Sequence, residues 1–495
     1  MKTYLAAFLI LLVATTSYSQ LSNPNPRTIV TTDGEVDDMD SFIRLLLYAN
    51  NLNIVGFVYS SSEFHYAGDG KGTQFTSSMP WAKQYGTRTE LRWLGTRWIQ
   101  DYIDKYALVY PNLVLHDKNY PTPGHLKSLV KVGNITFEGE MEHDTEGSDF
   151  IKKILLDDNN VPVLVQIWGG TNTVARALKS IEDEYKSSAK WQDVYRKVSD
   201  KLVLYLILDQ DETYKKYVSV SWPDVNIIDN SAQFWSLAYP WKQMSPPDMH
   251  PYLGGKWFAG NIKFNHGPLL DGYFLWGDGQ KLTADFDHTH GDTVEMKKKG
   301  MSKYDFISEG DSPSYLYLVD VGLRSTEDAS YGGWGGRMVK SAPHKWQDGD
   351  KAMDFNTATQ KEDKAYPQTR WIDAMQSDFA ARADWCVKSY GEANHAPVIK
   401  LTRGKDVSAA KGETVKLGAS AADPDKNKVT YKWWQYFEAD SYAGKITLNS
   451  PSSGKTSFTV PMDAQSGDTI HVICEVMDNG TPALTRYMRV IVTVK

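Results

Sequence analysis

The stretch "RTIVTTDGEVDDMDSFIRLLLYANN", which begins at Arg27, joins an apolar strand to an amphipathic helix through an acidic turn. Apolar residues recur at helical spacing after the turn, at Phe42, Ile43, Leu46 and Leu47. The next segment, "LNIVGFVYSS", is again typical of a buried strand. A strand, a helix and a strand in this order predict a βαβ unit, so the chain is expected to fold around a mostly parallel sheet.

The same alternation continues along the chain. "GSDFIKKILL" predicts a helix, "VPVLVQIW" a strand, "GGTNTVARALKSI" a tight turn with a helix, and "DKLVLYLILDQD" a buried strand. In "EGDSPSYLYL", Ser312 is expected to cap a helix that Pro313 begins. The predicted fold class is therefore α/β, with helices flanking the sheet.

The pattern changes near "GEANHAPVIKL", where helical spacing gives way to short alternating runs between turn residues. The runs are "APVIKL", "TVKLGASA", "KVTYKWWQYF", "KITLNS", "TSFTVPM", "TIHVICEVMD" and "TRYMRVIVTV". Short strands at this density predict an antiparallel, immunoglobulin-like β-sandwich. With 495 residues the chain is long enough for two domains, which we place at residues 20–392 and 393–495.

One turn of the predicted sandwich, "DPDKNK", carries Asp423 and Asp425 in alternation. Alternating carboxylates can ligate calcium, but a solvated hairpin is the more common explanation for such a segment.

Residues 1–19 have a charged start, a short apolar run and a small-x-small site, which predict a signal peptide and a secreted or periplasmic protein. No later segment is long and apolar enough to predict a membrane span. The two cysteines, Cys386 and Cys474, fall in different predicted domains, so a disulfide framework is not expected.

The formal net charge of −7 comes without any Lys/Arg-rich run, which argues against nucleic acid and anionic membranes as partners. The 16 tryptophans suit stacking on sugar rings, although buried core aromatics explain most of them. The sequence leaves the oligomeric state open.

The acidic turn holds five carboxylates within residues 33–40. Parallel strands end along one edge of a sheet, so this turn, the Trp168 turn and the Asp311 turn are expected to converge. Converging carboxylates favour a hard divalent cation, Ca²⁺ or Mg²⁺. Capping of the following helix by Asp is the alternative explanation for the cluster alone.

Three segments carry a resemblance to nucleoside hydrolases: D-x-x-x-D-D in "TTDGEVDDMD", the turn "VQIWGGTNTVARAL" and the late segment "SEGDSPSYL". With "PTPGHLKSLVKVGN", "YGGWGGR" and the terminal sandwich, nearly the whole chain resembles a secreted nucleoside-hydrolase-like family whose members are often labelled cellulose-binding.

The resemblance implies a calcium site and a reaction. Asp33, Asp38, the Trp168 carbonyl and Asp311 would be the calcium ligands, and Asp37 would contact sugar hydroxyls. Asp33 would also take the proton of the water that attacks the anomeric carbon through an oxocarbenium-like transition state. A single displacement of this kind inverts the anomeric configuration.

The chain also departs from nucleoside hydrolases. Gly310 stands where that family commonly has a His before the last Asp, and Glu63 stands where it has a ribose-binding Asn. The substrate Asn after the fourth strand corresponds to Asp224 or Asn226. These changes affect nucleobase recognition and leave the calcium and sugar machinery in place, so a different leaving group is the simplest inference.

Further candidate residues each have a structural alternative. Glu309 is a candidate general acid or a surface carboxylate, and His65 a pocket residue or a structural one. Trp334 and Arg337 lie on a glycine-rich loop, which suits either contact with a sugar face or a tight turn. His288 and His290 are interpreted as part of a solvated loop.

The sequence thus predicts an exported, calcium-dependent glycosidase acting on a furanosyl or other pentose unit of a plant-type glycan or oligosaccharide. The alternatives are an N-ribosyl hydrolase and a non-catalytic carbohydrate-binding protein. Fold analogy alone does not identify the substrate.

Overall fold

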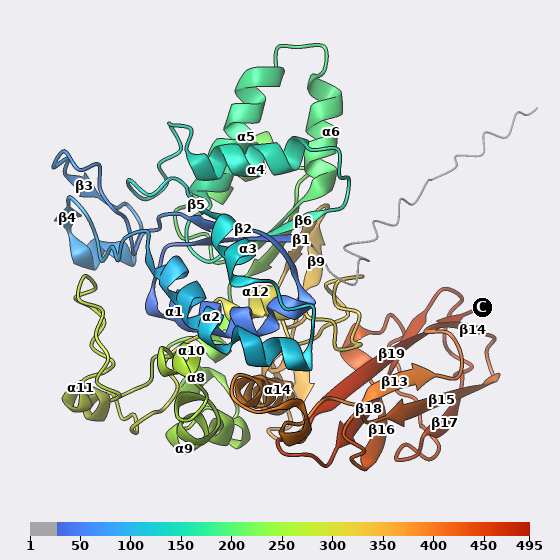
Figure 1. Cartoon of the computed structure of the whole chain (residues 1–495). Helices are drawn as coiled ribbons and strands as arrows, with labels where there is room; N and C mark the ends of the chain where they lie inside the picture. Colours follow the sequence, from blue (N-terminus) through green and yellow to red (C-terminus); the bar gives the residue numbers. More distant parts are fainter. Residues whose placement is uncertain (1–26) are drawn as a thin grey trace, which may run out of the picture.

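The computed structural model describes residues 27–495, so the predicted signal peptide lies outside the described residues. The chain forms one large sheet with helices on both faces, and its C-terminal part forms two smaller sheets to one side (Figure 1). The α/β class with a C-terminal all-β part is therefore confirmed.

The large sheet has eight strands in the order β5-β2-β1-β6-β7-β8-β10-β9, all in parallel pairs except β9 with β10. The strands are β1 (Arg27–Thr32), β2 (Asn53–Tyr59), β5 (Val130–Val132), β6 (Val163–Ile167), β7 (Leu202–Ile207), β8 (Asn226–Asn230), β9 (Val339–Ala342) and β10 (Lys345–Gln347). The predicted βαβ unit is β1, α1 and β2, and its strands pair in parallel.

Helices cover both faces of this sheet. Along β6, Val163, Val165 and Ile167 pack in the core beneath α4, α5 and α6, whereas Leu164 belongs to the core with α1, α2 and α14. The longer helices are α1 (Val36–Tyr48), α2 (Trp98–His116), α4 (Glu146–Leu156), α5 (Asn172–Tyr185), α6 (Trp191–Lys201) and α14 (Ile372–Trp385). Burial on both faces explains why these strands are continuously apolar.

Short elements fill the connections. They are β3 (Phe75–Thr76), β4 (Thr87–Arg88), α3 (Pro123–Ser128), α7 (Ser219–Ser221), α8 (Trp241–Met244), α9 (Gly255–Phe258), α10 (Pro268–Asp271), α11 (Thr293–Lys298), α12 (Ser312–Leu316), β11 (Asp354–Asn356), β12 (Lys361–Asp363) and α13 (Tyr366–Thr369). Ser312 is the first residue of α12 rather than its cap, because Asp311 occupies the capping position.

The C-terminal strands form the sheets β13-β15-β17 and β14-β19-β18-β16, which share one apolar core. They are β13 (Val398–Leu401), β14 (Asp406–Ala409), β15 (Thr414–Ala422), β16 (Val429–Gln435), β17 (Lys455–Thr459), β18 (Thr469–Asp478) and β19 (Thr485–Val494). The predicted strand "KITLNS" is wrong, because the Gln435 side chain accepts the hydrogen bond of the Ile446 amide. The domain boundary at residues 392/393 stays a prediction.

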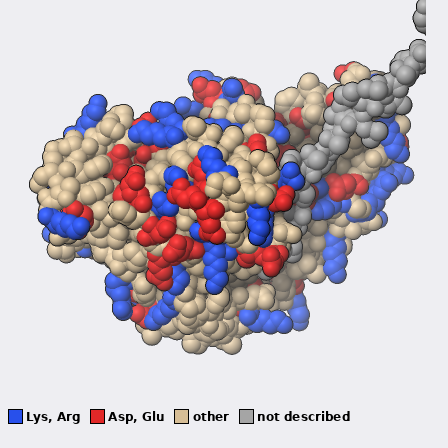
Figure 2. Space-filling view, turned by 90° about the horizontal axis from the view of Figure 1, so that it is seen from above, with Lys and Arg blue, Asp and Glu red and all other residues tan. Residues whose placement is uncertain are grey.

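Figure 2 looks down on the molecule and shows acidic and basic side chains mixed on this face. On the helices α4 and α5, Lys152 pairs with Glu184 at 2.7 Å and Lys179 pairs with Asp183. Both cysteines are free and buried. Within residues 27–495, no helix has the length and apolarity that crossing a membrane requires.

Candidate active site

A pocket of 690 Å³ opens at the carboxyl ends of the parallel strands. Its wall takes residues from the turns after β1, β6, β7 and β8, and from the later segments 276–299 and 311. The acidic turn, Trp168 and Asp311 therefore meet at one edge of the sheet, as the shared strand polarity predicts.

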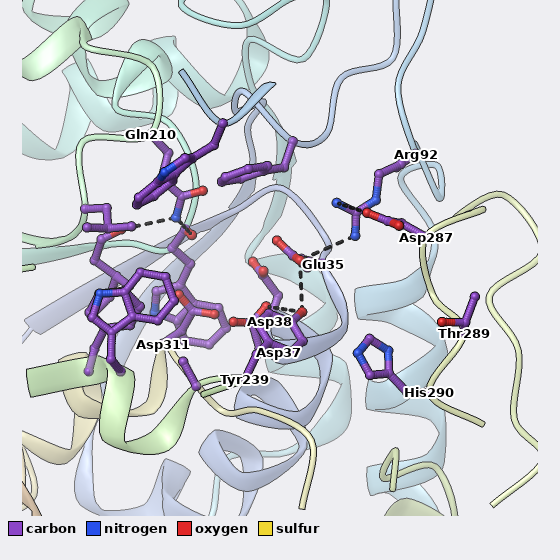
Figure 3. A pocket seen from close by; sticks show the side chains of 18 of the residues that line it. Glu35, Asp37, Asp38, Arg92, Gln210, Tyr239, Asp287, Thr289, His290 and Asp311 are labelled. Atoms are coloured by element: carbon purple, nitrogen blue, oxygen red, sulfur yellow. Dashed lines mark hydrogen bonds and ion pairs between the residues drawn. The ribbon is translucent and has the colours of Figure 1, made fainter. Parts of the chain in front are cut away.

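Three carboxylates form the floor of the pocket (Figure 3). Asp37, Asp38 and Asp311 each offer an oxygen atom that lies within 4.8 Å of the others. Burial and the charges of Glu35 and Asp33 raise the pKa of Asp37 to about 8. Burial and neighbouring carboxylates also raise the pKa of Asp38 and of Asp311 well above the usual value. Negative charge is costly here without a cation.

Helix capping does not account for the cluster. Glu35 occupies the capping position of α1, yet its side chain makes no capping hydrogen bond. Asp38 instead accepts a hydrogen bond from the Thr32 hydroxyl at the end of β1. The turn that joins β1 to α1 requires a glycine at position 34. Gly34 has a φ of +85°, and a Cβ atom added there would lie 2.8 Å from the Trp98 ring nitrogen.

Asp33 lies beside the three carboxylates, next to the buried His65. The His65 Nδ1 atom is 3.6 Å from Asp33, and its Nε2 atom is 3.6 Å from Asp285. Burial and the Arg92 charge oppose protonation of His65, but Asp285 and Asp33 outweigh them and raise its pKa to about 9. Burial disfavours the Asp33 carboxylate, yet His65 holds the Asp33 pKa below its usual value.

The oxygen atoms of this site fit a hard cation. Both carboxylate oxygens of Asp33 and the Oδ2 atom of Asp311 are buried without a hydrogen-bond partner. Among residues 27–495, no Lys or Arg nitrogen lies within 4.0 Å of the carboxylates of Asp37, Asp38 or Asp311. Oxygen donors that are buried, anionic and unpaired suit Ca²⁺ or Mg²⁺.

Two glycines keep the floor open. A Cβ atom at Gly310 would lie 2.8 Å from an Asp37 oxygen, and one at Gly169 would lie 2.9 Å from the Asp33 side chain. The carboxylate of Asp37 thus occupies the space that a side chain at position 310 would need, so this position supplies no general acid.

Aromatic residues form the upper wall of the pocket. Trp81 is 50% exposed, stacks on Phe64 at 6.3 Å and meets Trp235 edge-on at 6.1 Å. Deeper in, the rings of Tyr239 and His290 stack at 5.6 Å. A polar floor beneath flat apolar faces suits a sugar, whose hydroxyl groups and ring faces need both surfaces. His290 therefore lies in the pocket and not in the predicted solvated loop.

Several wall residues were not predicted. Gln210 donates to the Trp168 carbonyl at 2.7 Å, and its position directly after a buried strand was a signal that could have found it. Tyr239 donates to Glu35 at 2.9 Å, and Arg92 also lies 3.4 Å from Glu35. Tyr239 and Arg92 come from irregular segments, where no periodic pattern marks them.

The structure corrects the prediction for Glu309. Its carboxylate is fully buried, pairs with Arg44 at 3.1 Å, and accepts hydrogen bonds from Ser312 and from the Tyr273 hydroxyl. It does not line the pocket. The residues that Glu309 contacts also do not line the pocket. Glu309 is therefore neither a general acid nor a surface carboxylate.

Trp334 and Arg337 also lie outside the pocket. Trp334 is 1% exposed, and Arg337 donates to Asp354 at 2.8 Å. Asp354 in turn accepts a hydrogen bond from Tyr436, the residue directly after β16 of the C-terminal part. The glycine-rich loop therefore packs against the C-terminal sheets, and its predicted contact with sugar is wrong.

The remaining predicted substrate residues do not line the pocket. Glu63 is buried and accepts the Ala82 amide at 3.2 Å, which supports the neighbouring Trp81, and His65 holds Asp33 from behind. Asn226 is the first residue of β8 and therefore lies at the opposite edge of the sheet, with its side chain 3.2 Å from His344. Its predicted substrate contact is wrong.

Comparisons with known proteins agree with this arrangement. Residues 27–338 match the family described as "Cellulose-binding Sde182, nucleoside hydrolase-like domain", and residues 414–494 match "Cellulose-binding protein Sde0182, C-terminal domain". No curated protein matches the chain at a significant level.

Among solved structures, a nucleoside hydrolase-related protein from Saccharophagus degradans "associated with carbohydrate metabolism" is similar to 95% of this chain over 100% of its own length. Its sequence identity is 27% and its TM-score is 0.69. The PKD domain of the KIAA 1837 protein matches 19% of this chain and 86% of its own, with 20% identity and a TM-score of 0.15.

Mouse cadherin-23 EC22-24 matches 21% of this chain and 33% of its own, with 23% identity and a TM-score of 0.17. Neither of these two low scores carries weight for the fold. The family match covers most of the chain, from β1 to the glycine-rich loop, and a second match covers the C-terminal sheets. The chain therefore belongs to the Sde182 family of cellulose-binding proteins with a nucleoside hydrolase-like domain.

Proposed function

We propose that this protein is an exported, calcium-dependent glycosidase that releases a furanosyl or other pentose unit from a glycan or oligosaccharide. The observation that carries the proposal is the cluster of buried carboxylates at the floor of an aromatic pocket, with unpaired oxygens on Asp33 and Asp311. Calcium and export are part of the proposal.

The calcium ligands would be Asp38 and Asp311 of the clustered carboxylates, Asp33 through its unpaired oxygens, and the Trp168 carbonyl, which also accepts the Gln210 hydrogen bond. Asp37 belongs to the same cluster. Bound calcium would supply positive charge that offsets the carboxylates and holds sugar hydroxyls in place. The fit rests on the unpaired oxygens of Asp33 and Asp311 and on the finding that, among the described residues, no Lys or Arg nitrogen lies within 4.0 Å of the carboxylates of Asp37, Asp38 or Asp311.

The chain's own residues have distinct roles in the proposed reaction. Asp33, held by His65, accepts the proton of the attacking water, and the leaving-group oxygen takes a proton from solvent in the pocket as the glycosidic bond breaks. The acidic floor stabilises the positive charge that develops on the sugar ring. Asp37 accepts a hydrogen bond from a sugar hydroxyl. Tyr239 and the ring of Trp235 restrict the sugar to one orientation above the floor.

A second function is supported by the family description and the aromatic wall: binding of carbohydrate without catalysis. An N-ribosyl hydrolase is less well supported, because Gly310 cannot assist a leaving base and a side chain there would collide with Asp37.

The test is sugar release by the purified full chain from furanosides, plant-glycan oligosaccharides and nucleosides, with and without a calcium chelator. We expect release from at least one glycan substrate, complete loss with chelator, and recovery on adding calcium. NMR of the first product should show an inverted anomeric centre. Binding of oligosaccharides with no turnover on any substrate would favour the binding protein, and release from nucleosides alone would favour the N-ribosyl hydrolase.

The aromatic wall gives a second expected outcome. Changing the half-exposed Trp81 to alanine removes one ring face beside Trp235, so KM for an oligosaccharide should rise about tenfold, corresponding to roughly 1.4 kcal/mol of lost contact. We expect kcat to change little, because Trp81 belongs to the upper wall of the pocket and not to its acidic floor.

The control for this variant is Leu108→Ala, at a side chain that is 68% exposed on α2 and does not line the pocket. An unchanged KM for Trp81→Ala on every oligosaccharide would remove Trp81 from the binding site.

A further inference from the structure

A chain of polar side chains joins the segment before β13 to two turns of the C-terminal sheets. Asp423 lies in the turn between β15 and β16, and its carboxylate accepts a hydrogen bond from the backbone amide of Asn427 at 2.8 Å. The Asn427 side chain donates to Asn394 at 2.7 Å, and Asn394 donates to Asp478, the last residue of β18, at 3.1 Å. Asp423 and Asp478 therefore stand at the two ends of one short hydrogen-bonded chain.

Each of these carboxylates has one unsatisfied oxygen. Asp478 is 2% exposed, and its Oδ1 atom accepts the amides of Gly480 and Leu484. The Oδ2 atoms of Asp478 and Asp423 are buried and have no hydrogen-bond partner. A buried anionic oxygen without a partner costs free energy, so something outside the described atoms is expected to compensate it.

No side chain provides that compensation. In the part of the chain that the structure describes, no Lys, Arg or His nitrogen lies within 4.0 Å of the carboxylate of Asp423 or Asp478. Burial and the Asp423 charge accordingly raise the pKa of Asp478. Three candidates remain for this compensation: an ordered water molecule, a shared proton and a bound cation.

Asp425, which alternates with Asp423 in the sequence, is not available as a ligand. Its carboxylate accepts the backbone amide of His395 at 2.6 Å and lies 3.0 Å from the His395 ring nitrogen. The second carboxylate of the pair is therefore Asp478, on β18, and not Asp425. The alternation of Asp423 and Asp425 in "DPDKNK" identified only the first of the two residues.

We propose that Asp423 and Asp478 hold a calcium ion where the chain enters the C-terminal sheets. One carboxylate in a turn and one at a strand end, joined through the side chains of Asn394 and Asn427, match the flexible all-oxygen coordination of calcium better than the strict octahedron of magnesium. Since Asn394 precedes β13, the ion ties this entering segment to the ends of β15 and β18.

The site does not depend on the proposed glycosidase. It uses none of the residues of the pocket, so it can be tested in a chain whose pocket site has been removed. Asp38→Asn is the parent variant for this test, because Asp38 belongs to the acidic floor of the pocket and lies in the first turn of α1.

The experiment starts from full-length protein stripped with a chelator and dialysed. Calcium binding is measured by calorimetric titration, and the melting temperature is measured with and without calcium. We expect Asp38→Asn to bind one calcium ion per chain and to melt at a higher temperature with calcium. Adding Asp478→Asn should abolish both effects, and Asp423→Asn should do the same if Asp478→Asn folds poorly by circular dichroism.

Asp149→Asn, at an exposed aspartate on α4, is the matched control and should bind as its parent does. The inference is overturned if Asp38→Asn binds no calcium, which would leave an ordered water or a shared proton as the explanation. It is also overturned if neither Asp478→Asn nor Asp423→Asn lowers the stoichiometry. Failure of the pocket site alone would look different, because wild type and Asp38→Asn would then bind the same number of ions.

Discussion

Replacing Asp38 with asparagine is expected to abolish calcium-dependent sugar release and, at the same time, to make the calcium-free protein more stable. The asparagine keeps the shape of the side chain and an oxygen that can accept the Thr32 hydroxyl, so the turn after β1 should survive. What disappears is one of three carboxyl groups whose oxygen atoms lie within 4.8 Å of each other.

The loss of activity should be large because a direct ligand is removed. Changes in residues that only orient metal ligands typically cost about 10- to 100-fold in affinity or activity, and loss of a ligand should exceed that. The gain in stability has the opposite origin. Without calcium, Asp38 is held beside Asp33 and Asp311 in a buried site that raises its pKa. Each unit of such a pKa shift corresponds to about 1.4 kcal/mol of free energy.

Two measurements check this prediction: sugar release at saturating calcium, and melting temperature in chelator. Asp149→Asn makes the same chemical change at an exposed position and should alter neither quantity. A variant Asp38→Asn that still needs calcium and still turns over at the wild-type rate would show that Asp38 is not a ligand. A lower melting temperature in chelator would show that the carboxylate supports the apo fold.

The sequence contained the information for this part of the site because the relevant signals are local. The apolar run of β1, the acidic turn and the helical spacing of α1 lie within 22 consecutive residues, from Arg27 to Tyr48. Parallel strands then place Trp168 and Asp311 at the same edge. Pattern and topology were enough to bring these residues together.

The errors arose where a side chain's partner lies far away in the chain. Glu309 pairs with Arg44, 265 residues earlier, and Arg337 reaches the C-terminal part through Asp354 and Tyr436. No spacing rule links such positions, so a carboxylate beside a turn could not be distinguished from a catalytic one. Tyr239 and Arg92 were missed for the related reason that irregular segments have no periodicity to interpret.

The predicted strand set of the C-terminal sheets failed in the same way. β14 was not predicted because its alternating run is only four residues long, and the strand β19 with which it pairs in parallel lies about 85 residues later. "KITLNS" has the composition of a strand, yet a side chain binds the Ile446 amide in place of a neighbouring strand. Tertiary partners decided both cases.

Glu309→Gln should lower the free energy of unfolding by about 3–5 kcal/mol, the usual cost of removing one partner of a buried ion pair. Arg44 and Glu309 have side-chain exposures of 1% and 0%, so solvent cannot replace the lost carboxylate. Arg44 would keep its contacts with Gln376 and the Met375 carbonyl, but its charge would be uncompensated. Urea unfolding and melting temperature measure the effect.

The same variant separates a structural role from a catalytic one. If Glu309 only supports the segment that carries Asp311, kcat at a temperature where the variant is folded should stay within about threefold of wild type. A general acid would show the reverse: near-native stability and a fall in kcat of about 100-fold or more. Arg44→Met supplies the matching half of a double-mutant cycle. Because the two side chains are in contact, the double variant should lose less stability than the sum of the single variants. Additive losses would mean that the 3.1 Å contact between Arg44 and Glu309 contributes little, and that each side chain stabilises the fold through its other contacts.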